Sequence, residues 1–243
     1  MKQIVLLIFL LLVGCSSSKT FRKFSKQENV AIKKYRNAVN VKDGRYHVLI
    51  VTSLGDMVVT LYNETPLHRD NFVSKVKAGF YDSLLFHRVI DKFMIQGGDP
   101  ESKHAKEGAS LGSGDAPGGR IPAEFRIDKG IYHKRGVLAA ARDGNPEKAS
   151  SNCQFYIVQR KPWRVSELDS TVVGRRLSLN AEQKKVYTEK GGTPHLDGGY
   201  TVYGELEVGF DVLDKIAGAK TNGADRPLQD IRMKMFLLNE IKK

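Results

Sequence analysis

The sequence is poor in cysteine and has no long apolar segment. Its 243 residues contain only two cysteines, Cys15 and Cys153, so the chain cannot be a disulfide scaffold and must be stabilised by a hydrophobic core. The longest apolar run, Ile4 to Val13, is shorter than the ~20 residues that span a bilayer. A hydrophobic content of 41% is normal for a globular protein, and the length predicts one domain plus a linker.

Signatures of metal and nucleophile chemistry are also absent. The histidines show no HExxH or comparable spacing, there is no GxSxG, and the segment GSGDAPGG lacks the GK[ST] ending of a phosphate-binding loop. Cys153 lies in an apolar strand pattern, where burial would raise the pKa of its thiol and make it inert. The sequence therefore predicts an activity without a cofactor or a metal ion. The six histidines are His47, His68, His87, His104, His133 and His195.

The first residues have the pattern of an export signal. Met1-Lys2-Gln3 supplies a positive start, the apolar run follows, and it ends in Leu12-Val13-Gly14-Cys15. This LVGC sequence resembles a bacterial lipobox, in which residues 1–14 are removed and the cysteine is acylated. The resemblance implies that Cys15 is a lipidation site that holds the protein to a membrane of the bacterial cell envelope, on the periplasmic side. The alternative is an ordinary signal peptide with a chance cysteine.

The formal net charge is +12, and part of the excess lies between Lys19 and Lys42. We expect residues 15–44 to form a lipidated, basic tether. Its basic residues alternate with Phe21, Phe24, Ile32 and Tyr35, so two readings are open: contact with an anionic membrane surface, or a solvated tether, partly helical, that only adds reach. The high pI also makes nucleic-acid binding a function to consider. Export and the lack of a recognition motif predict that the protein has no nucleic-acid partner.

After Gly44 the sequence alternates short apolar segments with glycine. Leu54-Gly55-Asp56 predicts a hairpin turn, Thr65 and Pro66 predict the start of a helix, and residues 210–217 have the apolar spacing of a second helix. Many short strands with two helices favour a closed β-barrel with helical plugs. The predicted strands are residues 46–53, 57–62, 86–90, 93–97, 136–141, 154–159, 200–206 and 231–238.

One segment, about 162–194, does not follow the barrel rhythm. Asn180, with Gln183 three residues later, predicts a helix cap before residues 181–190, and Gly191-Gly192 predicts the end of that helix. We therefore expect an inserted helical excursion between two strands.

Five segments in order, FHRVI, FMIQGGD, GVLAAAR, SNCQFYI and LDGGYTVYGEL, resemble the cyclophilin family of peptidyl-prolyl cis-trans isomerases. The resemblance runs from about Tyr46 to the C-terminus, interrupted mainly by the excursion. It implies that residues 45–243 form the isomerase domain, a mainly β, closed antiparallel eight-stranded barrel capped by two α-helices. It also implies proline-containing polypeptides as substrates, here in exported or envelope proteins, and we expect a monomer.

Site residues follow from the resemblance position by position. It implies that Arg88 is the catalytic cation and that Gln96 and Gln154 are polar groups that grip the substrate, with Gln96 assigned to catalysis. The predicted proline pocket and substrate groove consist of Phe93, Met94, Ala141, Arg142, Tyr156, Leu196 and Tyr200. Four positions depart from the common pattern: Arg142 replaces a frequent asparagine, Tyr156 a phenylalanine, His195 a tryptophan, and Tyr200 a histidine.

Rotation about an X-Pro bond makes or breaks no covalent bond. A site with a cation, two amides and an apolar pocket is therefore sufficient for this reaction. The barrier is the amide resonance, ~18–20 kcal/mol. In the twisted transition state the prolyl nitrogen regains a lone pair that a guanidinium N–H can meet, so Arg88 would bind the transition state more strongly than the planar amide. The alternative function is a binding module: an envelope chaperone that holds prolyl segments without significant catalysis, or a scaffold that uses the excursion for docking.

Overall fold

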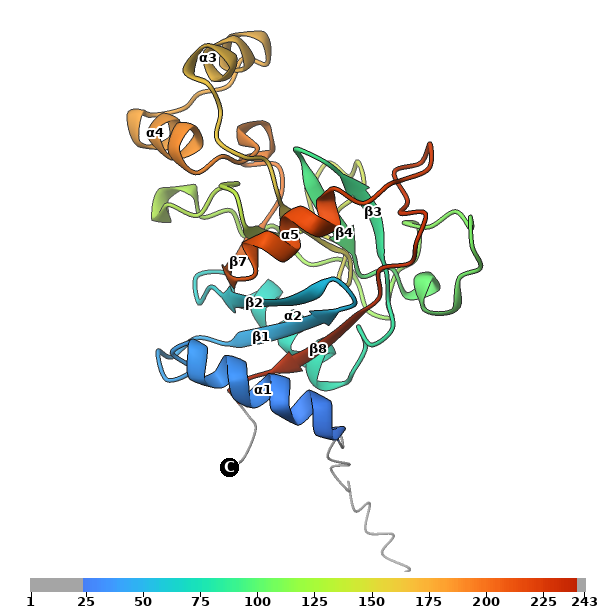
Figure 1. The fold of residues 1–243 in the computed structure, drawn as a ribbon. Helices are drawn as coiled ribbons and strands as arrows, with labels where there is room; N and C mark the ends of the chain where they lie inside the picture. Colours follow the sequence, from blue (N-terminus) through green and yellow to red (C-terminus); the bar gives the residue numbers. More distant parts are fainter. Residues whose placement is uncertain (1–23, 240–243) are drawn as a thin grey trace, which may run out of the picture.

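The computed structural model describes residues 24–239, which form a mainly β structure (Figure 1). Eight strands build one sheet in the order β3-β4-β6-β5-β7-β2-β1-β8, and every paired neighbour is antiparallel. The predicted eight-stranded antiparallel fold is confirmed. The strands are β1 (His47–Thr52), β2 (Gly55–Leu61), β3 (Phe86–Ile90), β4 (Met94–Gly97), β5 (Val137–Ala140), β6 (Phe155–Val158), β7 (Val202–Val208) and β8 (Met233–Leu237).

The sheet curves until its edge strands, β3 and β8, approach each other. Backbone hydrogen bonds join the start of β3 and the residues before it to the start of β8 and the residues just before it: Ser83 N–H donates to the Met233 carbonyl at 2.9 Å, and Phe86 N–H donates to the Ile231 carbonyl at 3.0 Å. Among the described residues, the contact between the two edge strands involves only a few residues. The predicted barrel is therefore closed over this short stretch rather than along a full strand pair. Elsewhere the neighbouring strands pair with one another, with register shifts in the β2–β7, β3–β4 and β5–β7 pairs. This pairing satisfies backbone polar groups of the buried strands.

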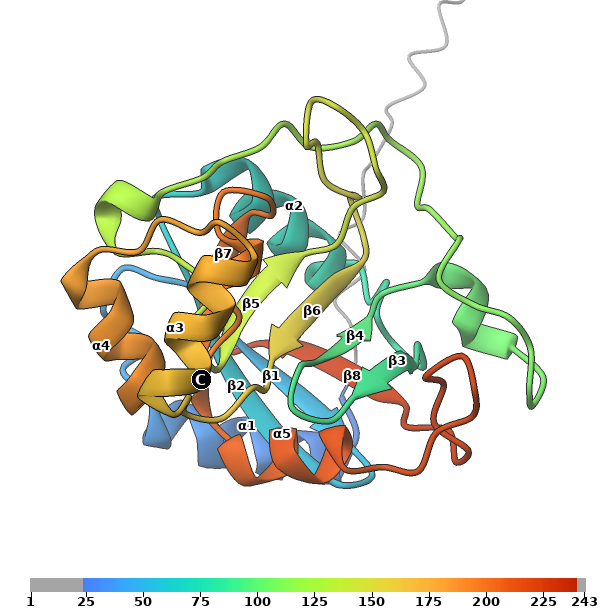
Figure 2. The same cartoon turned by 90° about the horizontal axis from the view of Figure 1, so that it is seen from above.

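Two helices cover the barrel, as expected: α2 (Pro66–Lys77) and α5 (Phe210–Ala217) (Figure 2). Phe72 and Val76 of α2, with Leu213 and Ile216 of α5, pack into one core with the inward side chains of the strands. On β8, Met233, Met235 and Leu237 belong to this core. The period of two in the sequence therefore directs alternate side chains of each strand into this core, while the other face of several strands is buried by other clusters.

The start of α2 differs from the prediction. Thr65 occupies the cap position but makes no side-chain cap hydrogen bond. The buried carboxylate of Glu124 accepts the N–H groups of Leu67 at 3.2 Å and His68 at 3.0 Å, and it also lies 2.7 Å from Nδ1 of His68. A carboxylate is stabilised at a helix N-terminus because it meets unpaired N–H groups and the positive end of the dipole.

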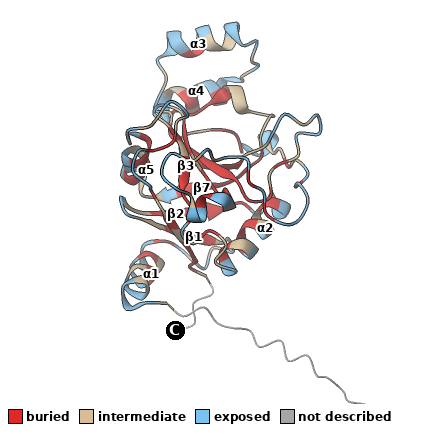
Figure 3. Cartoon of the chain, turned by 90° about the vertical axis from the view of Figure 1, so that its right-hand side faces the viewer, coloured by how far each residue is buried: buried red, intermediate tan, exposed pale blue. Residues whose placement is uncertain are grey.

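Helix α1 (Lys26–Ala38) corrects the expectation that residues 15–44 are a tether, as far as that segment is described. Ile32 and Tyr35 are buried and pack with Val39 against Leu49, Val58 and Phe236 on the outer face of β1, β2 and β8. The tether was predicted from the basic residues of this segment. The buried side of the helix, however, is apolar, and that side packs against the barrel. Figure 3 shows α1 at the opposite end of the molecule from the inserted helices.

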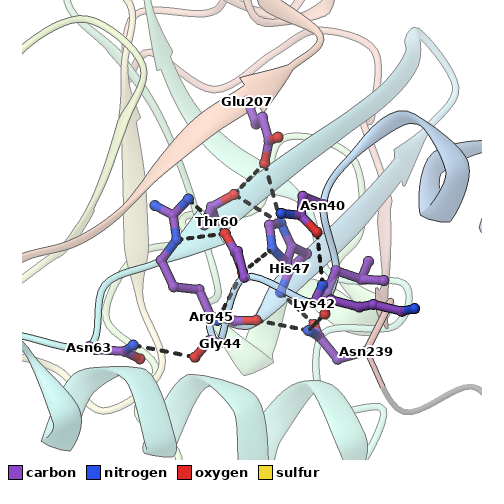
Figure 4. Close-up of polar contacts among 11 residues, drawn as sticks. Asn40, Lys42, Gly44, Arg45, His47, Thr60, Asn63, Glu207 and Asn239 are labelled. Atoms are coloured by element: carbon purple, nitrogen blue, oxygen red, sulfur yellow. Dashed lines mark hydrogen bonds and ion pairs between the residues drawn. The ribbon is translucent and has the colours of Figure 1, made fainter.

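The connection from α1 to β1 is fastened to the barrel by a buried histidine (Figure 4). Nε2 of His47 lies 3.0 Å from Oδ1 of Asp43, and Nδ1 lies 3.1 Å from Oγ1 of Thr60. The His47 N–H donates to Asn239, whose amide donates to the carbonyls of Val41 and Arg45. The contacts join residues before β1 to the end of β8, so α1 is part of the folded domain.

The excursion forms two helices, α3 (Val165–Gly174) and α4 (Ala181–Glu189), which project from the barrel (Figure 1). The predicted capping box of Asn180 and Gln183 is present at α4, whereas α3 has no side-chain cap and was not predicted. A small apolar cluster around Tyr187 and Leu168 holds the pair together. Three short 3₁₀ turns, Pro100–His104, Ile127–Lys129 and Pro194–Leu196, complete the described elements.

Cys15 and the signal segment 1–14 lie outside the described residues. Within residues 24–239, every helix is too short or too polar to cross a membrane.

Candidate active site

The site lies on the outer face of the sheet, where β3, β4, β6 and β5 run side by side. Arg88 is paired with Gln96, Gln96 with Tyr156, and Tyr156 with Ala139 in the strand registers. Side chains at paired positions of neighbouring strands share a face. The sheet therefore places the cation, an amide and the aromatic ring in one row, although Tyr156 is far from Arg88 and Gln96 in the sequence.

A β-bulge sets the direction of Arg88. The register of β3 and β4 shifts between Phe86 and Arg88, and Phe86 packs in the barrel core while Arg88 lines the outer pocket. Without an extra residue, positions two apart would share a face. The extra residue, His87, is 3% exposed, and neither ring nitrogen has a hydrogen-bond partner among the described residues.

Nine of the ten predicted substrate-site residues line one pocket: Arg88, Phe93, Met94, Gln96, Ala141, Arg142, Tyr156, Leu196 and Tyr200. The tenth, Gln154, lines an adjoining recess together with Gln96, Ala141 and Arg142. The tertiary structure thus brings the predicted residues together in one continuous groove.

A chain of polar groups forms one side of the pocket. Nη1 of Arg88 lies 3.5 Å from Oε1 of Gln96, and the Gln96 amide donates to Oε1 of Gln154 at 3.1 Å. The Gln154 amide donates in turn to the carbonyls of Gly112 at 3.0 Å and Gly114 at 2.8 Å. These bonds orient both glutamines, so that the Oε1 atom of Gln96 faces the guanidinium.

The opposite side is apolar and aromatic. The Phe93 and His195 rings stack with centroids 5.9 Å apart. Tyr200 meets Tyr156 edge to face at 5.9 Å, and the Arg142 guanidinium lies 4.7 Å from the centre of the Tyr200 ring. Burial and the nearby Arg175 cation lower the pKa of His195 to about 4, so this ring is neutral at pH 7. The pocket therefore offers a dry surface for a proline ring.

The hydroxyl of Tyr156, an addition to the usual phenylalanine, has a partner beneath the pocket. Its oxygen lies 2.9 Å from Nε2 of His133, and Nδ1 of His133 lies 3.0 Å from Oδ1 of Asp197. Tyr187 of α4 donates to Oδ2 of Asp197 at 2.6 Å. Burial raises the pKa of Tyr156 well above its ordinary value, so the hydroxyl keeps its proton.

Other reactive groups are not directed into the pocket. Cys153 is 2% exposed, and burial raises the pKa of its thiol. Among residues 24–239 no three His, Cys, Asp or Glu side chains are grouped so that they could hold a metal ion.

Sequence reasoning did not identify four residues that contact the site from outside the matching strands. Asp225 pairs with Arg88, and His133, Asp197 and Tyr187 form the chain under Tyr156. Asp197 lies within the quoted segment LDGGYTVYGEL, which was the only available signal. The others lie in loops or in the excursion, where no periodicity marks them.

Comparisons with known proteins agree with this arrangement. The family model described as cyclophilin type peptidyl-prolyl cis-trans isomerase matches residues 47–236. A Staphylococcus aureus protein named provisionally as a peptidyl-prolyl cis-trans isomerase is 36% identical over 194 residues, covering 79% of this chain and 90% of that protein. A Streptococcus pyogenes protein named provisionally as a bifunctional phosphatase/peptidyl-prolyl cis-trans isomerase is 38% identical over 189 residues, and the match spans 37% of its length.

The fold also resembles solved structures of a Cryptosporidium parvum cyclophilin type peptidyl-prolyl cis-trans isomerase. Two of them align at 22% identity with TM-scores of 0.59 and 0.56, each covering 79% of this chain, and one was determined in the presence of the dipeptide Ala-Pro. These alignments show a cyclophilin-like fold, and the family model and the Staphylococcus aureus relative show the family. The chain belongs to the cyclophilin-type peptidyl-prolyl cis-trans isomerase family.

Proposed function

We propose that this isomerase acts on X-Pro bonds of exported or envelope proteins and that Arg88 supplies the transition-state interaction. The observation that carries the proposal is the position of Arg88: its guanidinium lines the rim of a pocket whose other walls are Phe93, Met94, Tyr156 and Leu196. A proline ring held by these walls would present its nitrogen to the guanidinium. The pocket binds the ring in both the planar and the twisted states, whereas the guanidinium meets a lone pair only in the twisted state.

The energies are consistent with this division of roles. A hydrogen bond to a charged group contributes ~1.5–3 kcal/mol, or roughly tenfold to 150-fold in rate. The remaining reduction of the ~18–20 kcal/mol barrier comes from holding the ring while the carbonyl side turns, and from removing the amide from water. Gln96 and Gln154 point their amide groups along the same rim and would bind the substrate backbone.

The test compares Arg88→Ala with the parent protein. We expect the catalysed exchange rate, measured by NMR at saturating peptide, to fall about tenfold or more, while the dissociation constant of a proline peptide changes much less. Arg88→Lys should restore only part of the rate, since lysine keeps the charge but loses the planar fork. Arg69→Ala, on α2 and outside the pocket-lining set, is the matched control. Exchange by Arg88→Ala at the parent rate would leave the prolyl-binding chaperone as the function.

Cellular location is a separate part of the proposal. The LVGC sequence supports acylation of Cys15 and retention in the cell envelope. The arrangement of the folded domain is compatible with such an anchor, because α1 packs on β1, β2 and β8 while the pocket lies over β3, β4, β6 and β5. A membrane on the α1 side would leave the pocket open to substrates.

A further inference from the structure

The excursion is joined to the pocket by a continuous set of hydrogen bonds, which are buried at Tyr156 and partly buried at Asp197. From α4, Tyr187 donates to Asp197; Asp197 contacts His133; and His133 contacts the hydroxyl of Tyr156 in the pocket floor, with distances of 2.6, 3.0 and 2.9 Å in that order. Tyr187, His133 and Tyr156 are 0%, 1% and 5% exposed. Water therefore has little access to these groups, and each depends on its neighbour for a hydrogen-bond partner.

The donors and acceptors in this chain can be assigned. Oδ1 of Asp197 faces both the backbone N–H and the ring Nδ1 of His133, at 2.9 and 3.0 Å. Because a carboxylate only accepts, Nδ1 carries a proton. In the neutral ring Nε2 then accepts from the Tyr156 hydroxyl. Loss of the Tyr187 hydroxyl would leave Oδ2 of Asp197 without its donor, and the change would reach His133 through the same carboxylate.

The end of the excursion is also fixed directly to the loop that carries His133, just before β5. The N–H of Thr193 donates to the His133 carbonyl at 2.8 Å, and the N–H of Arg135 donates to the Gly191 carbonyl at 3.1 Å. Gly192 has φ +132°, and a Cβ there would lie 2.2 Å from the His133 carbonyl oxygen. Only glycine permits this approach, so α4 is held in one position relative to His133.

We propose that Tyr187 is a positioning residue for the isomerase site: acting through Asp197 and His133, it holds the Tyr156 ring at the angle that receives the proline. The excursion is then a working part of the active site rather than a removable insertion. Tyr156 contacts the substrate ring in both the planar and twisted states. If the Tyr156 ring is held less firmly, substrate binding should weaken, so KM should rise with little change in kcat. This inference rests on the proposed role of the pocket.

The experiment uses the full chain and four variants: Tyr187→Phe, Tyr156→Phe, the double variant, and Tyr132→Phe. The phenylalanine at position 187 keeps the ring in its apolar cluster and removes only the hydroxyl. Tyr132 packs against the Tyr187 ring with centroids 5.7 Å apart, and its hydroxyl is outside the Tyr187-Asp197-His133-Tyr156 chain, so Tyr132→Phe is the matched control. For each protein, kcat and KM are measured by NMR exchange with a proline peptide.

We expect Tyr187→Phe to raise KM about fivefold in the parent, the scale of one hydrogen bond, and by less than about twofold when Tyr156 is already phenylalanine. Tyr132→Phe should leave KM unchanged. An equal factor in both backgrounds would show independent structural damage and overturn the proposal. So would an unchanged KM, or a fall in kcat alone, which indicates lost active protein.

A second measurement does not depend on turnover. The ring ¹⁵N resonances of His133 should show a proton on Nδ1 in the parent, and Tyr187→Phe should shift both resonances while Tyr132→Phe leaves them in place. If the parent proved inactive, the proposed function would fail, yet these resonances would still report the connection. Identical His133 resonances in parent and Tyr187→Phe would refute the connection whatever the activity.

Discussion

Nε of Arg88 lies 3.4 Å from Oδ2 of Asp225. The two side chains come from β3 and from the loop before β8, and the Asp225 carbonyl also accepts the N–H of Val89 at 2.8 Å. Asp225 has φ 60°, an uncommon conformation for a non-glycine residue that aspartate tolerates better than most. The carboxylate leaves the Nη1 side of the guanidinium facing Gln96, so the ion pair orients the cation at the pocket rim.

Neutralising this partner should weaken activity moderately. The Arg88 and Asp225 side chains are 42% and 43% exposed, and exposed pairs contribute ~0.2–1 kcal/mol. We therefore expect Asp225→Asn to lower kcat/KM by roughly twofold to fivefold at low salt. The difference should shrink in high salt because exposed charges are screened. Asp211→Asn, which removes an exposed carboxylate paired with Lys215 on α5, should leave activity unchanged. Parent activity for Asp225→Asn at low salt would contradict the orienting role.

His87 should make the folded state sensitive to acid. Burial, with the cations Arg88 and Arg226 adding to it, lowers the pKa of His87 from 6.5 to about 4. Between these values the unfolded chain binds a proton that the folded protein does not, so stability is present above pH 6.5 and is lost as pH falls toward 4. The full effect of this one group is about 3 kcal/mol.

Replacing the ring tests that assignment. Because neither nitrogen of His87 has a partner among residues 24–239, His87→Leu should fold, and its unfolding free energy should decline less than the parent's between pH 6.5 and 4. Urea unfolding at several pH values provides the measurement. His104→Leu, at an exposed histidine, is the control and should keep the parent slope. An unaltered slope in His87→Leu would assign the acid sensitivity to other groups.

Glu124 should stabilise the protein through the start of α2. Its side chain is buried, and its charge meets two helix N–H groups and the His68 ring. Glu124→Gln keeps the shape but removes the charge and places an NH₂ against N–H donors, so we expect a loss of ~1–3 kcal/mol. Thermal and urea unfolding measure it. Glu64→Gln changes an exposed carboxylate just before α2 and should cost much less; equal losses would contradict capping by Glu124.

Membrane retention should depend on Cys15. Acyl chains contribute ~0.8 kcal/mol for each buried CH₂, so removing the acylated thiol removes the anchor. We expect Cys15→Ser to appear in the soluble fraction with its isomerase activity intact, because residue 15 precedes the folded domain. Cell fractionation with a high-salt wash checks this, and Cys153→Ser is the matched control. If Cys15→Ser still sediments with membranes after the wash, a lipid at this residue is not the anchor.

Much of the fold could be predicted from the sequence because its determinants are local. The alternation of Met233, Met235 and Leu237 with polar residues and Phe236 depends only on the strand period. The Asn180 and Gln183 capping box likewise operates within one turn of helix. The pocket residues were located by the order of five matching segments, and strand register then placed Arg88, Gln96 and Tyr156 in a row.

The partners of those residues were decided by tertiary structure alone. Phe236 is covered by α1, Glu124 replaces Thr65 at the start of α2, Asp225 faces Arg88, and the bulge at His87 directs Arg88 outward. Tyr187 reaches Asp197 from an insertion without strand periodicity. The paths of the loops and the closure of the barrel determine which of these segments lie close together. Sequence periodicity describes one helix or strand at a time and does not show which elements contact one another.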